Sequence, residues 1–156
     1  MPQATRGYAA TSASSPLGLF HFVRRDPREN DVVIDVLYSG VCHSDLHTAR
    51  NDWGGTVYPT VPGHELVGRV IAVGSAVTRF QVGDAVGVGC MVDSCQHCGA
   101  CAKGWEQYCE NGMTGTYNST DRVDGSATQG GYAERIVVRQ EFVLKMPQTL
   151  DLKGAA

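Results

Sequence analysis

The sequence predicts a mainly β fold with short helices, arranged as a small barrel. Short runs of β-favouring apolar residues alternate with turn residues at fairly even spacing. The 19 glycines among the 156 residues are scattered instead of repeated, which suits many tight turns. A chain of this length, taken as one domain over 1–156, buries about 70% of its unfolded surface without disulfide support.

Five segments have the length and composition of strands: 31–38, 64–73, 85–89, 134–138 and 141–145. In the first, alternate side chains share one face: Val32, Ile34, Val36 and Tyr38. In 85–89, valine alternates with glycine, so another part of the chain must approach this backbone closely. The last two segments predict a hairpin with Phe142 and Leu144 facing inward.

The clearest helix covers 44–50, and Ser44 is the expected cap at its start. A second helical turn is predicted at the end of the chain, where Thr149 could act as the cap. The apolar face of that turn is not completed, which fits either a fraying terminus or a chain cut inside a larger protein.

Composition argues against several classes of function. A net charge of −3 without any lysine- or arginine-rich run disfavours nucleic acid and anionic membrane as main partners. Residues 1–20 lack the charged start and the apolar stretch of a secretory signal, and no apolar run could span a membrane. The sequence therefore predicts a cytoplasmic protein, in which clustered cysteines serve as ligands more readily than as disulfide partners.

Four of the six cysteines follow the spacing C-x2-C-x2-C-x7-C: Cys95, Cys98, Cys101 and Cys109. Cysteines separated by two residues rarely form a good disulfide, and the x7 gap without a following proline disfavours an iron–sulfur cluster. Four thiolates at this spacing are typical of a closed structural zinc site, and we expect it in an irregular lobe at about 90–112. Cys90 is expected to be a buried thiol outside the set, and His97 a solvent-facing residue.

A second candidate metal site combines residues from two segments: Cys42, His64 and Glu65. Catalytic zinc takes three protein ligands of such types and keeps one position open. Asp45 could accept a hydrogen bond from His64 and fix its tautomer. Ser44 and His47 are three residues apart on the predicted helix and could pass a proton to solvent. On spacing alone, a buried thiol and a satisfied core histidine explain Cys42 and His64 equally well.

The segment GHELVGRVIAVGSAV matches the GHE-x2-G-x5-G-x2-V signature of zinc-containing alcohol dehydrogenases at each fixed position: Gly63, His64, Glu65, Gly68, Gly74 and Val77. GVCHSDLH precedes it and the four cysteines follow it, in that family's order and spacing. From about residue 17 onward, the chain resembles this medium-chain dehydrogenase/reductase superfamily. VCHSDLH, YPTVPGHE and GTYN are most similar to its cinnamyl-alcohol branch. The resemblance implies a GroES-like β-barrel with an inserted zinc-binding lobe.

The resemblance also implies the metal ligands. Cys42 and His64 would bind the catalytic zinc, and Glu65 would be an occasional or outer ligand. The structural zinc would be bound by the four clustered residues: Cys95, Cys98, Cys101 and Cys109.

Further roles follow from the same resemblance. Ser44 and His47 would form the proton relay, Asp45 would orient His64, and His43 would contact the cofactor phosphate. Two residues would line the substrate pocket, although ordinary packing explains them nearly as well: Trp53 and Met91.

The family also has parts that these 156 residues do not supply. A third, cysteine ligand of the catalytic zinc would fall a few residues past Ala156, and no G-x-G-x-x-G turn of a Rossmann cofactor domain is present. We therefore expect the zinc-binding catalytic domain of an NADP-dependent alcohol dehydrogenase or aldehyde reductase, inactive or nearly so alone. The alternative is a stand-alone or split zinc-binding module that docks another chain, such as a cofactor domain. A chaperonin-like partner has the least support, because a shared fold does not imply a shared function.

Overall fold

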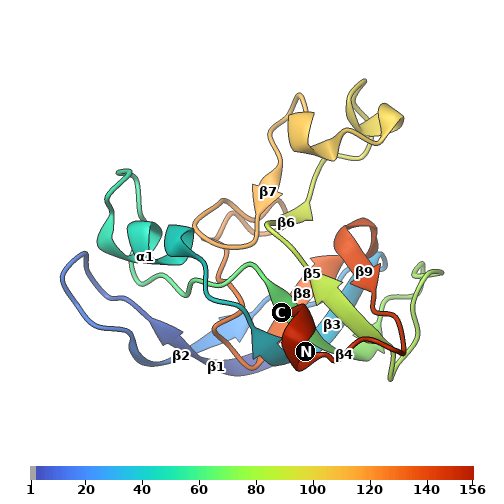
Figure 1. Ribbon diagram of the computed structural model, residues 1–156. Coiled ribbons are helices and arrows are strands. Elements are labelled where there is room, and N and C mark those ends of the chain that lie inside the picture. The colour runs from blue at the N-terminus through green and yellow to red at the C-terminus, as the bar shows by residue number, and fades with distance from the viewer. Residues whose placement is uncertain (1–2) are drawn as a thin grey trace.

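A computed structural model describes residues 3–156. At its centre is a five-stranded antiparallel sheet that curls into a half-open barrel, in the order β8–β3–β4–β5–β9 (Figure 1). Its strands are β3 (Asp31–Ser39), β4 (Leu66–Val73), β5 (Ala85–Val88), β8 (Arg135–Arg139) and β9 (Val143–Lys145). The barrel is filled mainly by β-branched side chains that the sheet turns inward: Val32, Ile34, Val70, Val86, Ile136, Val138 and Val143.

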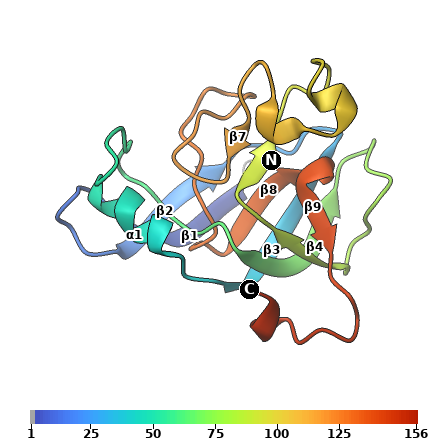
Figure 2. The ribbon, with the colours of Figure 1, turned by 45° about the horizontal axis from the view of Figure 1, so that its top comes forward.

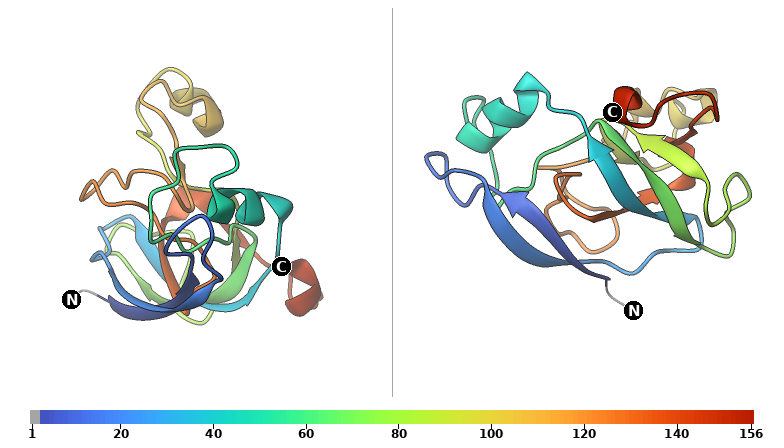
Figure 3. Two further views of the ribbon diagram at one scale, coloured as in Figure 1. Left: turned by 90° about the vertical axis from the view of Figure 1, so that its left-hand side faces the viewer. Right: turned by 60° about the horizontal axis from the view of Figure 1, so that its bottom comes forward.

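Two smaller ribbons flank this sheet. β1 (Gln3–Ala9) pairs with β2 (Gly18–Arg24), and a bridge from Gly7 to Ala133 ties β1 to the rest of the barrel. β6 (Met91–Asp93) pairs with β7 (Thr114–Gly115) at the base of a lobe that projects away from the sheet (Figure 3).

The helices are short. Within residues 3–156, α1 (His43–Arg50) is the one α-helix, and four single 3-10 turns lie elsewhere in the chain: Cys101–Lys103, Glu106–Tyr108, Gln140–Phe142 and Lys153–Ala155. The last of these carries the chain end to the margin of the sheet near the end of β3 (Figure 2). Across residues 3–156, every helix is too short and too polar to cross a lipid bilayer.

The predicted hairpin between 134–138 and 141–145 is wrong. β8 pairs with β3 and β9 pairs with β5, so the two strands lie at opposite edges of the sheet. The 3-10 turn between them redirects the chain before β9, and Val143 becomes the buried residue while Leu144 is 60% exposed. Phe142 does pack against the core, as expected.

Three smaller expectations also change. α1 begins after Cys42, whose backbone N–H donates to Oδ2 of Asp45, so Ser44 lies inside the helix instead of capping it. Cys90 is exposed and is not a buried thiol. The end of the chain forms the 3-10 turn Lys153–Ala155 and not a helix capped by Thr149.

Steric crowding explains why glycine is required at the fixed glycine positions of the GHE signature. A Cβ on Gly68 would lie 2.3 Å from the carbonyl oxygen of Asp35 in β3, and one on Gly74 would lie 2.3 Å from the Arg28 and Glu29 oxygens. Gly63 adopts φ +102°, a backbone conformation that side chains disfavour. The signature therefore marks where β4 and the turn before it press against neighbouring backbone.

An ion cluster joins the lobe to the sheet. Asp31, with no exposed surface, accepts hydrogen bonds from Arg25 Nη1 at 2.6 Å and from Arg28 Nη2 at 2.9 Å. Arg28 also reaches Asp93 Oδ2 at 2.7 Å, and Arg25 reaches Asp121 Oδ2 at 3.0 Å. Because Asp93 ends β6 and Asp121 follows the lobe, the two arginines bound to Asp31 hold both ends of the lobe.

Candidate metal centres

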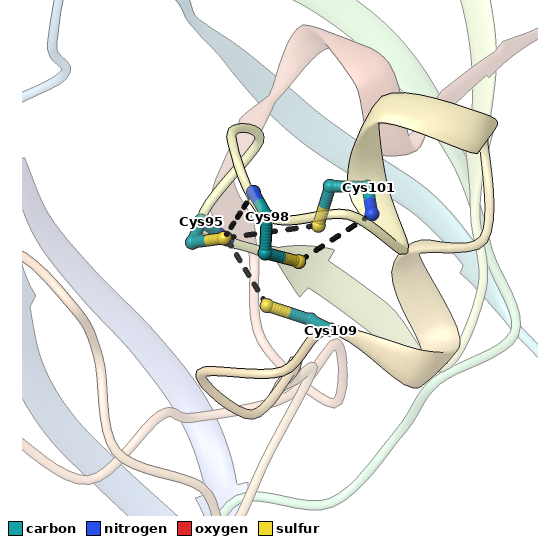
Figure 4. Close-up of side chains that lie close together, drawn as sticks. All are labelled: Cys95, Cys98, Cys101 and Cys109. Atoms are coloured by element: carbon teal, nitrogen blue, oxygen red, sulfur yellow. Dashed lines mark hydrogen bonds between the residues drawn. The ribbon is translucent and has the colours of Figure 1, made fainter.

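The four clustered cysteines meet at one point of the lobe. The sulfurs of Cys95, Cys98, Cys101 and Cys109 lie within 4.8 Å of one another and point toward a common centre (Figure 4). All four are free thiols. Tetrahedral zinc with Zn–S bonds of about 2.3 Å separates its sulfurs by about 3.8 Å. The 3.9 Å between the sulfurs of Cys95 and Cys101 fits such an ion.

Backbone N–H groups surround the sulfurs, as thiolates require. Cys98 Sγ accepts from the N–H of Cys101 at 3.5 Å and of Glu110 at 3.4 Å. Cys95 Sγ accepts from the N–H of Cys98 at 3.4 Å. A hydrogen bond from Asn111, helped by N–H donors, lowers the pKa of Cys95 to about 5.

The thiol of Cys101 resists ionisation without a cation. The Ser94 hydroxyl, 3.3 Å from Cys101 Sγ, favours the thiolate, but burial and the neighbouring thiols raise the pKa of Cys101 to about 11. Four ionised thiols in one place therefore need a positive ion to neutralise them, which is the chemistry of a structural zinc site.

The second predicted set also converges. One ligand atom each of Cys42, His64 and Glu65 lies within 4.8 Å of the other two, where the chain enters α1 and where it enters β4. His64 Nε2 and Glu65 Oε1 are 3.9 Å apart. Cys42 and His64 are half-buried and Glu65 is exposed, so one side of the cluster faces solvent. A sulfur, an imidazole and a carboxylate with an open side suit zinc that keeps a free position.

Asp45 connects the two strongest ligands of this set. Its carboxylate is 3% exposed; Oδ2 accepts from the Cys42 N–H at 3.0 Å, and Oδ1 accepts from the Gly63 N–H at 3.0 Å. Oδ1 also lies 3.1 Å from Nδ1 of His64, which leaves Nε2 of that ring toward the metal position. Burial would raise the pKa of Asp45, but its hydrogen-bond donors hold it below the ordinary value, so the group is a carboxylate.

Two tyrosines complete this arrangement, although neither is among the site residues predicted from the sequence. The Tyr132 hydroxyl donates to Asp45 Oδ2 at 2.8 Å. The ring of Tyr117 lies against His64, with 5.7 Å between centroids, and burial raises the pKa of its hydroxyl to about 12. Tyr117 lies in the GTYN segment but was given no role, and Tyr132 lies in no quoted motif, because the partners of both residues are distant in the chain.

The remaining predicted residues lie on α1, in the loop that follows it and on β6. The Ser44 hydroxyl donates to Cys42 Sγ at 3.1 Å. The His47 ring contacts the rings of His43 and Trp53 in tilted arrangements, with 4.7 Å and 4.9 Å between centroids. Trp53 is 66% exposed, and a half-buried Met91 lies in β6 opposite Gly115 of β7.

Residues 28–148 match the family model of the alcohol dehydrogenase GroES-like domain. The chain belongs to this family. NADP-dependent alcohol dehydrogenase C of Mycobacterium tuberculosis is 54% identical to this GroES-like domain over 149 residues, which are 96% of the chain and 43% of that relative. The predicted family and fold are thereby confirmed, and the chain spans less than half the length of this relative.

Solved structures of related proteins have the same fold as this chain. The crystal structure of CAD from Helicobacter pylori complexed with NADP(H) is 38% identical, with a TM-score of 0.96 over 100% of this chain and 45% of that one. A cobalt- and zinc-bound thermostable alcohol dehydrogenase from Pyrobaculum aerophilum is 31% identical, with a TM-score of 0.73 over 98% and 44% of the two chains.

Proposed function

We propose that this GroES-like domain supplies the metal site and the proton path of a zinc- and NADP-dependent alcohol dehydrogenase that interconverts alcohols and aldehydes. The observation that carries the proposal is the convergence of Cys42, His64 and Glu65 beside the hydroxyl of Ser44. The relatives support it, because their names pair alcohol dehydrogenase activity with NADP and with zinc.

Two zinc ions fit the donor sets. Cys42, His64 and Glu65 would hold one ion, and the other would bind the four clustered thiolates: Cys95, Cys98, Cys101 and Cys109. The first ion, when bound, would supply Lewis-acid polarisation of the alcohol or carbonyl oxygen. The second would fix the lobe, whose buried centre consists largely of these cysteines.

The chain's own residues would orient the ligands and move the proton. Asp45 holds the Nδ1–H of His64 and thereby sets the tautomer that directs Nε2 outward. Ser44, beside Cys42 Sγ, would exchange a proton with the substrate oxygen, and His47 would pass it to solvent. The His47 side chain is partly exposed and lies 2.8 Å from Asp52, so it can release the proton at the surface.

The cofactor and substrate contacts follow from the same placement. His43 is exposed at the start of α1, where it would contact the cofactor phosphate. Trp53 and Met91 would border the substrate, an alcohol or aldehyde. We infer that the nucleotide-binding fold lies in the part of the longer relatives that this chain does not span. The pure chain is therefore expected to be inactive or nearly so, and its cytoplasmic location stays a prediction.

Cobalt substitution tests the proposal on the chain itself. With Co2+ in the site, a primary alcohol or an aldehyde should shift the visible absorption, and Cys42→Ser should abolish that shift. An unchanged spectrum with Co2+ bound at this site would contradict substrate binding there. In a separate assay, NADPH oxidation with an aldehyde faster than with free zinc would contradict the expected inactivity.

A second candidate function is a zinc module that docks another chain. A groove of about 590 Å³ between β1 and β3 favours it, because exposed apolar residues line it: Tyr8, Leu19, Leu37 and Tyr38. Sedimentation over a wide concentration range tests whether this other chain is a second copy, since a monomer throughout would count against self-association through this groove. Activity regained on mixing with a cofactor domain would support a split enzyme.

A further inference from the structure

Two histidines lie one turn apart on α1, outside both candidate metal centres. His43 and His47 are four residues apart in the helix, so their rings share one face, with centroids 4.7 Å apart and a tilt of 36°. His43 is exposed and His47 is half-buried. The H-x3-H spacing on a helix is the one by which two imidazoles reach a single metal ion in other proteins.

The state of the His47 ring favours ligation. Its Nδ1 lies 2.8 Å from Oδ2 of Asp52. Because a carboxylate can only accept, Nδ1 carries a proton, and in the neutral ring Nε2 then keeps its lone pair. A ring with one nitrogen held by a carboxylate and the other free is the usual arrangement of a metal-ligating histidine.

We propose that His43 and His47 chelate a divalent transition-metal ion of the Ni2+, Cu2+ or Zn2+ class, while Asp52 fixes the His47 ring. Metal–nitrogen bonds of about 2.1 Å require the two nitrogens to be about 3 Å apart, and the exposed His43 ring can turn to meet this distance. Imidazole suits these ions better than it suits Mg2+ or Ca2+. The ion occupies Nε2 of His47 and so blocks proton transfer through it; this consequence, but not the binding, rests on the proposed function.

Trp53 provides the readout, because its ring lies 4.9 Å from the His47 ring between centroids, at a tilt of 32°. Trp105→Phe removes the other of the two tryptophans, which is exposed on the lobe. Ni2+, a paramagnetic quencher, is titrated into this variant after both zinc centres have been loaded. We expect saturable quenching of Trp53 and, by isothermal titration, one Ni2+ per chain.

Matched variants decide the outcome. His43→Gln and His47→Gln should raise the half-quenching Ni2+ concentration at least about 10-fold, and Asp52→Asn about 10-fold. His21→Gln, which removes another exposed histidine on β2, should leave it unchanged. Equal midpoints in the parent and in His43→Gln, or no quenching up to about 1 mM Ni2+, would overturn the proposal. Quenching that persists in Cys42→Ser would support it even if the dehydrogenase proposal failed.

Discussion

The hydroxyl of Tyr132 donates a 2.8 Å hydrogen bond to Oδ2 of Asp45, across 87 positions of the chain. The same carboxylate accepts from the backbone of Cys42 through Oδ2 and faces Nδ1 of His64 through Oδ1. Tyr132 thus stabilises the group that relates two candidate zinc ligands to each other.

Tyr132→Phe should therefore weaken zinc binding at the Cys42–His64 site by about 10-fold, because the carboxylate loses a donor while the ring remains. The matched control is Tyr58→Phe, whose hydroxyl donates instead to the Ala49 carbonyl at the other side of α1. Competition with a zinc chelator measures both affinities. Equal affinities in the two variants would contradict a role for Tyr132 in positioning Asp45.

Metal removal should unfold the lobe selectively. Its buried cluster consists of Cys98, Cys101 and Cys109, so little else holds residues 95–109 once zinc is chelated. Hydrogen exchange should show lost protection there, whereas β3 and β4 keep theirs. Cys101→Ser should have the same effect, and Cys90→Ser, at an exposed thiol outside the set, should have none. Retained protection in the lobe after zinc removal would contradict this account.

Asp31→Asn should cost about 3–5 kcal/mol of unfolding free energy at pH 7, because Arg25 and Arg28 lose the fully buried carboxylate that they share. The exposed pair of Arg6 and Glu134 supplies the control, since solvent screens it and Glu134→Gln should change stability little. Urea unfolding of both variants measures the difference. A loss for Asp31→Asn no larger than that for Glu134→Gln would refute the role of this cluster.

The same residue predicts a pH dependence. Burial would raise the pKa of Asp31, but hydrogen bonds from Arg28 and Arg25 hold it below its ordinary value of 3.8. A pKa that is lower in the folded state stabilises the fold above the unfolded-state pKa, and this contribution is lost as the pH falls through the folded-state pKa. The stability of the parent should therefore fall more steeply below about pH 4 than that of Asp31→Asn. An equal fall of the unfolding free energy with decreasing pH in the two proteins would be inconsistent with the lowered pKa of Asp31.

Gly68→Ala should destabilise the fold by about 1–3 kcal/mol, since the added Cβ meets the carbonyl oxygen of Asp35 at 2.3 Å. Gly89→Ala is the control, because a Cβ there has no atom within 4 Å among its described surroundings. The midpoint temperatures of thermal unfolding show whether the destabilisation comes from contact of the added Cβ with backbone or from replacing any glycine. Similar midpoints would argue against the steric explanation of the signature.

The features that local sequence patterns encode, namely the cysteine cluster and the central strands, were predicted from the sequence. The four cysteines lie close together in the chain and their spacing already describes a tetrahedral site, while β3, β4 and β5 carry dense apolar runs. It missed β1, which is short of apolar residues, and β2, in which Leu19 and Val23 face solvent. The false hairpin arose because both strands do exist, and only long-range pairing decides their neighbours. Tyr117 and Tyr132 were missed for the same reason.

Zinc per chain, counted by native mass spectrometry on protein purified without added metal, tests the central claim most directly. The account predicts two zinc ions in the parent chain and one each in Cys101→Ser and Cys42→Ser. A parent without zinc, or a count that neither substitution lowers, would contradict both metal centres.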